Sequence, residues 1–211
     1  MRFICALLVL CAFAGPVAGQ GLPDDRIAEA APDSFKVAFE TSKGPFDVVV
    51  YRAWSPYAAD RFYHLVRLGF YDGVSLFRVV AGYVVQFGIS NDAETNRAWR
   101  PRGLIDEPVL AHNARGTISF ARGGPNTRTT QVFINLSDNA MLDNLVNGGV
   151  RGYPPFGRVV SGMDEVVAMF NADYGNAPAM RQDSINVAGR AFLDRAFPGL
   201  DYVVRAKLVD F

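Results

Sequence analysis

Short apolar segments follow one another in pairs along this chain, and turn-forming residues separate the members of each pair. In the first pair, at 35–52, FKVAFETSKGPFDVVVYR alternates around SKGP with Phe35, Val37 and Phe39 on one face, which predicts a β-hairpin. Further strands are predicted in SLFRVVAG and YVVQFG on either side of Gly82, and then in GTISFAR, QVFINL, PFGRVV and DYVVRAKLV. Strands that arrive in consecutive pairs favour an antiparallel sheet.

One helix is predicted over 55–69, SPYAADRFYHLVRLG, with Ser55 as its N-cap, Pro56 in its first turn and Gly69 after its last. SGMDEVVAMF predicts a short second helix, and apolar residues at helical spacing predict a third over 183–196. The polar stretch 89–114 is predicted to be a long surface loop. We therefore expect a mainly β fold, a closed eight-stranded antiparallel β-barrel capped by two or three helices.

The first residues have the pattern of a secretory signal. Arg2 precedes an apolar run and a stretch of small residues, so we expect a signal peptide over 1–19 that is cleaved just before Gln20. A membrane anchor is the alternative, but the run is shorter than the roughly 18–20 residues that a span requires. We expect a flexible lead-in over 20–33 and one domain over 34–211, exported to the periplasm or secreted.

Several classes of chemistry have no support in the sequence. Both cysteines, Cys5 and Cys11, lie in the expected signal, so the mature chain would have no thiol nucleophile, disulfide or cysteine zinc site. His64 and His112 lack acidic partners at the spacing of metal ligands, so we expect no metal and no cofactor. Basic and acidic residues number 21 each, which disfavours nucleic acid as a partner. We expect a monomer that does not bind membranes once its signal is removed.

Polar side chains occur within the most apolar strands. Arg78 and Gln86 interrupt FRVVAGYVVQFG, and Gln131 stands two residues before Phe133, on the same face of a strand. From periodicity alone, an arginine on a strand is most often solvated and a phenylalanine beside it belongs to the core.

The order of the motifs changes this interpretation. FYDGVSLFRVVAGYVVQFG, then HNARGTISFARGGPNTRTTQVFINLSDNAMLDN, then GYPPFGRVVSGMD resembles the cyclophilin family of peptidyl-prolyl isomerases, especially its bacterial members. The resemblance extends from about Phe35 to Phe170. The family pattern F-x-R-V-x-x-G-[FY]-x-x-Q is met by Phe77, Arg78, Val79, Gly82, Tyr83 and Gln86, and a second pattern, around S-Q-F-F-I, by Gln131, Phe133 and Ile134.

The resemblance implies a role for each matching residue. Arg78 takes the place of the catalytic arginine, and Gln86 and Gln131 take those of polar groups that hold the substrate backbone and the arginine. The resemblance places the walls of the proline pocket at Tyr83, Val84, Phe133 and Leu142. Ala121 and Arg122 match the segment that pairs with the peptide main chain, and Met141 and Tyr153 match rim positions.

The chain departs from the family pattern at several places. Tyr83 stands where Phe is common, Val84 where Met is common, Val132 in place of a Phe, Phe87 within the usual Q-G-G, Ile89 where Asp is common, and Met141 where some members carry Trp.

The resemblance implies a peptidyl-prolyl cis-trans isomerase that assists the folding of exported proteins, with X-Pro peptides and unfolded exported chains as partners. One alternative is a proline-peptide binding module or chaperone with little turnover. Another is a different small-ligand barrel, which would not need an arginine in its wall.

Overall fold

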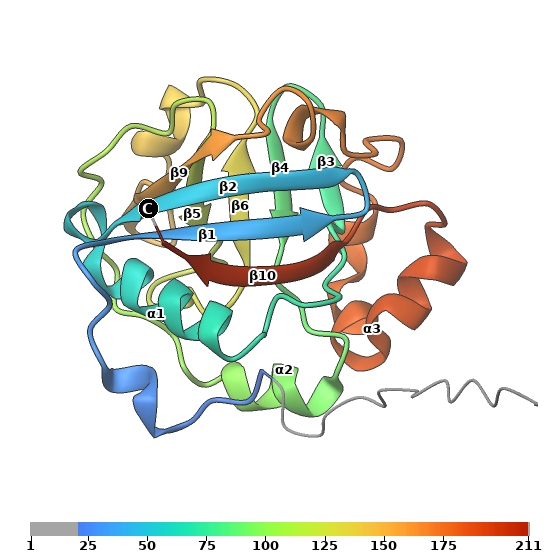
Figure 1. Cartoon of the computed structure of the whole chain (residues 1–211), viewed down its shortest axis with the longest axis horizontal. Coiled ribbons are helices and arrows are strands. Elements are labelled where there is room, and N and C mark those ends of the chain that lie inside the picture. Colours follow the sequence, from blue (N-terminus) through green and yellow to red (C-terminus); the bar gives the residue numbers. More distant parts are fainter. Residues whose placement is uncertain (1–20, 211) are drawn as a thin grey trace, which may run out of the picture.

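The computed structural model describes residues 21–210, and in this range eight strands form one antiparallel sheet (Figure 1). These strands are β1 (Ser34–Thr41), β2 (Gly44–Tyr51), β3 (Arg78–Val80), β4 (Val84–Phe87), β5 (Thr117–Phe120), β6 (Val132–Asn135), β9 (Pro155–Ser161) and β10 (Val203–Val209). Their order across the sheet is β10-β1-β2-β9-β5-β6-β4-β3, and β7 (Val146–Asn147) and β8 (Val150–Arg151) form a separate hairpin. The expected mainly β architecture is confirmed.

The sheet is an open half-barrel, so the expectation of a closed barrel was wrong. β10 and β3 lie at its two ends, and no strand ladder joins them within residues 21–210. A single bridge, between Ser75 and Tyr202, connects the segments that precede these strands. The ladder does not continue because β3 has only three residues and follows irregular turns rather than extended chain.

Three α-helices accompany the sheet in the described part of the chain: α1 (Pro56–Arg67), α2 (Ala93–Trp99) and α3 (Gln182–Ala196). Short 3-10 turns are η1 (Asp25–Ala28), η2 (Arg52–Trp54), η3 (Ala140–Asp143), η4 (Val167–Met169) and η5 (Pro178–Arg181). In Figure 1, α1 runs along the β10 side of the sheet and α3 stands apart from it at the other side of the molecule. α1 buries its apolar face, as predicted: Ala58, Ala59, Phe62, Leu65 and Val66.

Ser55 is the N-cap residue of α1, as predicted, but its side chain makes no capping hydrogen bond, and a distant carboxylate caps the helix instead. The backbone N–H groups of Tyr57 and Ala58 donate to Glu107 at 2.8 and 3.3 Å. The Ser55 hydroxyl itself donates to Glu107 at 2.5 Å, and the guanidinium of Arg128 pairs with the same carboxylate at 3.0 Å. Glu107 therefore caps the helix and also binds the buried side chains of Ser55 and Arg128.

The stretch 89–114, expected to be a surface loop, contains α2. The Asp92 side chain caps this helix by accepting a hydrogen bond of 2.7 Å from the backbone N–H of Thr95. Trp99, its last residue, is 1% exposed. Burial of this indole holds a short polar helix in place that its own propensity would not stabilise.

The two C-terminal helices that the sequence predicted had different outcomes. The helix expected in SGMDEVVAMF is reduced to the single turn η4, whereas the helix expected over 183–196 is present as α3. α3 buries Ile185 and Leu193 against Phe77 and Ile89. Ile89, which departs from the family pattern, is thus an apolar partner of this helix.

Phe87, another departure from the family pattern, belongs to the core. Along β4 the side chains alternate between the two faces of the sheet, so Val85 and Phe87 lie on the opposite face from Val84 and Gln86. The Phe87 ring packs edge-on against Phe39 at 6.0 Å. Phe87 therefore contributes to packing behind the site and not to the site itself.

The expected lead-in is packed against α1 over the part that the structure describes. The backbone N–H of Gly21 donates to the backbone carbonyl of Leu68 at 2.9 Å, and the ring of His64 forms a hydrogen bond of 2.7 Å with the carbonyl of Glu29. Residues 1–20, which include the expected signal peptide, lie outside the described range. Within that range no helix has the length and apolar character needed to cross a membrane.

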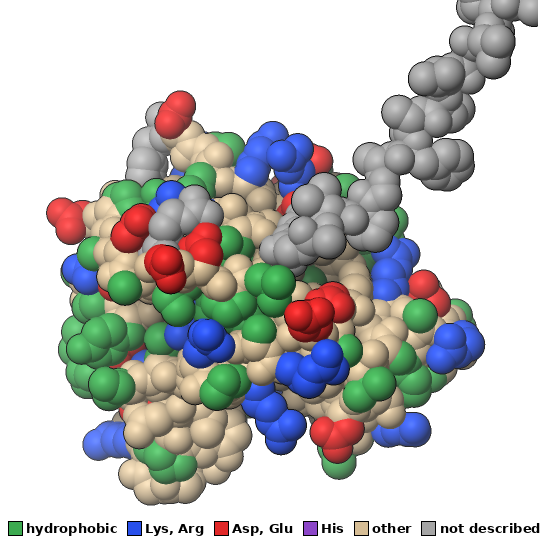
Figure 2. Space-filling view, turned by 90° about the horizontal axis from the view of Figure 1, so that it is seen from below, with side chains coloured by type: hydrophobic (Ala, Val, Ile, Leu, Met, Phe, Trp, Pro, Cys, Tyr) green, Lys and Arg blue, Asp and Glu red, His purple; other side chains and the backbone are tan. Residues whose placement is uncertain are grey.

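The face that carries α2, seen from below in Figure 2, shows basic and acidic side chains interspersed. Neither sign of charge forms a continuous patch on this face, in keeping with the equal numbers of the two in the sequence.

Candidate active site

Strand register brings three of the predicted site residues together on one face. Arg78 of β3 lies opposite Gln86 of β4, and Gln86 lies opposite Phe133 of β6. Residues directly opposite each other in neighbouring antiparallel strands point to the same side of the sheet. A guanidinium, an amide and a phenyl ring therefore form a row across β3, β4 and β6, and the alternation seen in the sequence required this arrangement once the strands had paired.

These side chains border a cavity of about 230 Å³. Its lining consists of Arg78, Tyr83, Val84, Gln86, Ala121, Arg122, Phe133, Leu142, Leu145 and Tyr153. Nine of the residues predicted for the site are in this set. Met141 is 62% exposed and lies outside the lining, and Gln131 lies in the wall of the neighbouring cavities.

One side of the cavity is apolar. Val84, Phe133 and Leu142 form a small buried cluster that is separate from the main core, with Tyr83, Ala121 and Tyr153 packed against it. Phe133 is 5% exposed, and its ring meets that of Tyr153 edge-on at 5.8 Å. The volume is below the 300–1,000 Å³ of pockets for drug-sized ligands, so it suits one small apolar ring or side chain.

Arg78 is held from two sides. Its Nε donates to Oδ1 of Asn176 at 2.6 Å, and its Nη1 donates to Oε1 of Gln86 at 2.9 Å. The guanidinium also lies 5.7 Å from the centre of the Tyr83 ring. Its Nη2 has no hydrogen-bond partner within residues 21–210, so this nitrogen can donate to a ligand in the cavity.

The hydrogen bonds continue beyond Gln86. Its Nε2 donates to Oε1 of Gln131 at 2.9 Å, and Nε2 of Gln131 donates to Oε1 of Gln182 at 2.9 Å. We call the chain Arg78–Gln86–Gln131–Gln182 the amide relay. It connects the arginine at the cavity with the first residue of α3.

A second guanidinium, that of Arg122, lines the same cavity. Arg122 is 8% exposed, donates to the carbonyl of Val150 at 2.7 Å and lies 4.6 Å over the Tyr153 ring. Burial lowers the pKa of Arg122 from its ordinary value. Ala121, beside it, donates its backbone N–H to Gln131, and the two residues extend the chain along the cavity after β5 ends.

The loop that carries Leu142 is fixed by polar contacts beneath the cavity. Asp143 accepts from the backbone and the side chain of Asn113 at 2.9 and 2.8 Å, and from the ring of His112 at 2.9 Å. Burial raises the pKa of Asp143, but these hydrogen bonds outweigh it and hold the pKa below its ordinary value. His112 is thus the exposed partner of a partly buried carboxylate.

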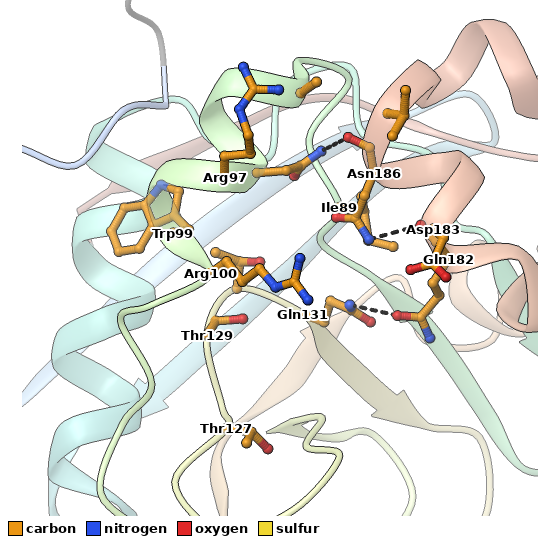
Figure 3. Close-up of a pocket in the computed structure, with 14 residues that line it drawn as sticks. Ile89, Arg97, Trp99, Arg100, Thr127, Thr129, Gln131, Gln182, Asp183 and Asn186 are labelled. Carbon is orange, nitrogen blue, oxygen red and sulfur yellow. Dashed lines mark hydrogen bonds between the residues drawn. The ribbon is translucent and has the colours of Figure 1, made fainter.

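Two further cavities lie beyond the first, and each shares lining residues with the one before it. One of about 170 Å³ shares Gln86, Ala121 and Arg122 with it. A larger one, of about 620 Å³, lies between α2, α3 and the chain before β6 (Figure 3). Gln131 and Gln182 line both of these cavities and point toward each other in Figure 3.

Sequence reasoning missed three residues of the site. Leu145 lines the cavity, Asn176 holds Arg78, and Gln182 ends the amide relay. Leu145 carried a weak signal, since it and Val146 are the apolar side chains of the otherwise polar run DNLVNGG. Asn176 and Gln182 carried none, because nothing in their neighbourhood indicates which strand they meet.

Comparisons with known proteins agree with this geometry. The family model described as cyclophilin type peptidyl-prolyl cis-trans isomerase/CLD matches residues 36–189. Peptidyl-prolyl cis-trans isomerase A of Dickeya dadantii is 36% identical over 140 residues, which are 65% of this chain and 72% of the relative. Peptidyl-prolyl cis-trans isomerase-like 1 of Rhizopus delemar is 34% identical over 139 residues, 64% of this chain and 79% of the relative.

Among solved structures, a cyclophilin type peptidyl-prolyl cis-trans isomerase of Cryptosporidium parvum superposes with a TM-score of 0.62 and 20% identity. It covers 84% of this chain and 99% of its own. The structure of that protein in the presence of the dipeptide Ala-Pro superposes with a TM-score of 0.61 and 19% identity, over 83% of this chain and 99% of its own. At these identities the likeness supports the cyclophilin fold.

Proposed function

The chain belongs to the cyclophilin-type peptidyl-prolyl cis-trans isomerases, and we propose that it accelerates rotation about X-Pro bonds in exported proteins with Arg78 as its catalytic donor. The observation that carries the proposal is the guanidinium of Arg78 beside a small apolar cavity, with Nη2 free of hydrogen-bond partners among residues 21–210. The family membership supplies the reaction, and the geometry supplies the roles of the residues.

The chemistry of the bond explains why an arginine suits the task. Rotation about an X-Pro bond takes tens to hundreds of seconds unaided, against a barrier near ~20 kcal/mol, because the nitrogen lone pair is delocalised into the carbonyl. Halfway through the rotation this delocalisation is lost and the nitrogen becomes pyramidal and basic. It can then accept a hydrogen bond that the planar ground state cannot, so a fixed donor stabilises the transition state selectively.

In this site Nη2 of Arg78 would donate to that nitrogen. The other two nitrogens of the guanidinium are held by Asn176 and Gln86, which restricts its rotation before substrate arrives. Gln86 therefore acts with Arg78, as a group that orients the donor. Such preorganisation lowers the cost of reorganisation during the reaction.

The hydrogen bond alone does not account for the catalysis expected of such an enzyme. Turnover on the order of 10³ per second against ~10⁻² unaided would require about 7 kcal/mol. One hydrogen bond from a charged donor contributes about 1.5–3 kcal/mol. The remainder would come from the cavity that takes the proline ring and from groups that hold the flanking backbone in a twisted form.

The remaining predicted residues fit those tasks. Phe133, Val84, Leu142 and Tyr83 would surround the proline ring, because they form the apolar side of the cavity. Ala121 and Arg122 would pair with the peptide main chain, and Gln131 would hold the next part of the substrate or the arginine. Tyr153 and the exposed Met141 would contact substrate at the rim.

We propose X-Pro-containing peptides and unfolded exported proteins as partners. The structure of the Cryptosporidium parvum protein with Ala-Pro supports a proline dipeptide as the minimal ligand. The signal-like pattern of residues 1–19 supports export to the periplasm or secretion, and the balanced charge supports a protein partner over nucleic acid.

A protease-coupled isomerisation assay on a short X-Pro peptide tests the function. We expect the wild type to exceed the uncatalysed rate and Arg78→Ala to lose about ten- to a hundredfold in kcat/KM, the value of one charge-assisted hydrogen bond. A wild type that binds the peptide but matches the uncatalysed rate would establish the alternative, a proline-peptide binding module, and reject the enzyme.

A further inference from the structure

We propose that Gln182, the first residue of α3, is a positioning residue that orients Arg78 through two intervening glutamine side chains. The inference rests on the proposed function, since only the isomerase reaction gives Arg78 a catalytic task. It assigns a role to a helix that contributes no residue to the wall of the 230 Å³ cavity and is connected to Arg78 by hydrogen bonds.

The contacts are continuous from the helix to the arginine. Gln182 accepts from Gln131, Gln131 accepts from Gln86, and Gln86 accepts from Arg78, each at 2.9 Å. The middle link is partly buried between neighbouring strands, because Gln86 is 7% exposed. Hydrogen bonds in such surroundings strengthen one another, and a disturbance at one end is felt at the other.

The direction of the relay follows from the donors available. A guanidinium has only donors, so Gln86 must turn its oxygen toward Arg78 and its NH₂ group away from it. Gln131 must then present its oxygen to Gln86, which leaves its own NH₂ group in need of an acceptor. Gln182 Oε1 is that acceptor. A donor in its place would oppose the NH₂ group of Gln131 and favour rotation of both amides, which would set an NH₂ group against the guanidinium.

α3 holds this acceptor in a fixed position. Ile185, one turn further along the helix, is 1% exposed and packs in the cluster with Phe77 and Ile89. The side chain of Asn186 donates to the carbonyl of Gln182 at 2.8 Å, and the carbonyl of Asn186 accepts from Asn96 of α2 at 3.1 Å. These bonds are drawn in Figure 3. A helix anchored to α2 and to the end of β4 can therefore determine the orientation of an amide at the sheet.

The same C-terminal segment holds the arginine a second time. Asn176, six residues before Gln182, accepts from Nε of Arg78 at 2.6 Å. The guanidinium is thus fixed on one edge by Asn176 directly and on the other through the amide relay. Residues 176–182 bracket the catalytic donor without lining the cavity in which the proline ring would lie.

Two substitutions of similar size and opposite hydrogen-bonding character test the role. Gln182→Glu keeps an acceptor and Gln182→Lys replaces it by a donor, so we expect kcat within about twofold of wild type for Glu and about fivefold lower for Lys, with KM unchanged in both. An effect confined to kcat indicates an interaction made in the transition state. Ala191→Glu and Ala191→Lys, at an exposed position of the same helix, control for the charge.

A second measurement is independent of turnover. The side-chain amide NMR signals of Gln86 and Gln131 are expected to shift in Gln182→Lys and to stay near their wild-type positions in Gln182→Glu. An active wild type with equal kcat in the Glu and Lys variants would overturn the positioning role. If the wild type has no activity, the proposed function fails; unchanged Gln86 signals in Gln182→Lys would then separately overturn the relay.

Discussion

Nε of Arg78 donates a hydrogen bond of 2.6 Å to Oδ1 of Asn176, which lies 98 positions further along the chain. With Nη1 engaged by Gln86, this bond leaves Nη2 as the nitrogen without a partner in the described chain, at the edge of the apolar cavity. Two nitrogens of the planar guanidinium are therefore hydrogen-bonded to the protein before any substrate binds, and they fix its orientation.

Arg78→Lys is expected to lose nearly as much activity as Arg78→Ala, about ten- to a hundredfold in kcat/KM. An ammonium keeps the charge, but it lacks the planar fork that can bond Asn176, Gln86 and the substrate nitrogen together. The protease-coupled assay measures the loss, with the exposed Arg158→Lys as control. More than half of wild-type activity in Arg78→Lys would show that charge alone suffices.

Phe133→Ala is expected to raise KM about tenfold and to lower kcat as well, since the ring is the buried centre of the cavity's apolar side. Truncation of a buried Phe also costs about 3–5 kcal/mol of stability. The kinetics should therefore be recorded well below the melting temperature of the variant. Phe133→Leu, which retains most of the apolar volume, is the matched control and should be affected less. An unchanged KM in folded Phe133→Ala would remove Phe133 from the proline site.

Asp143→Asn is expected to destabilise the protein at pH 7 by about 1–2 kcal/mol, because the carboxylate accepts from Asn113 and His112. The pKa of Asp143 is lower folded than unfolded, so its stabilisation is complete above the unfolded value near ~3.9 and is lost as the pH falls through the folded value. Urea denaturation at pH 7 and pH 3 should show the difference between wild type and variant shrinking at the lower pH. The same difference at both pH values would contradict this assignment; Asp210→Asn, at an exposed position, is the control.

Glu107→Gln is expected to cost about 3–5 kcal/mol of stability, because it leaves the charge of the fully buried Arg128 without its 3.0 Å partner and weakens the cap of α1. The midpoint of urea denaturation measures this, against the exposed Glu165→Gln. The double variant Glu107→Gln with Arg128→Met should recover part of the loss, since it removes the uncompensated charge. A double variant less stable than either single variant would argue against the charge as the cause.

Gly189→Ala is expected to destabilise α3 by about 1–3 kcal/mol. Gly189 has a φ of 51°, and a Cβ there would lie 2.6 Å from the Cα and carbonyl oxygen of Asn91. Hydrogen exchange of the α3 amides should accelerate. Gly124→Ala is the control, because a Cβ at Gly124 meets nothing within 4 Å. Unchanged exchange would show that the bend at Gly189 does not hold the helix in place.

Much of the site could be predicted from the sequence because its strands are short and regular. A side-chain period of two places Gln131 with Phe133 and Val84 with Gln86 on common faces, whatever the sheet's outer shape. The family motifs then indicated that residues of different strands belong to one site, and nine of the predicted residues do line one cavity. Where the outcome depended on a contact with a residue far along the chain, the prediction was wrong or incomplete. α2 depends on the burial of Trp99, and the cap of α1 on Glu107.

The mainly β fold, the family and the row from Arg78 to Phe133 could be predicted from the chain alone, because alternation and turn residues act over neighbouring positions. The open sheet, the packing of Ile89 against α3 and the contacts of Asn176 and Gln182 that hold the arginine emerged only in the folded structure. Each of these rests on contacts between residues far apart in the chain. A pattern of neighbouring residues does not specify such contacts, because they depend on where whole elements pack.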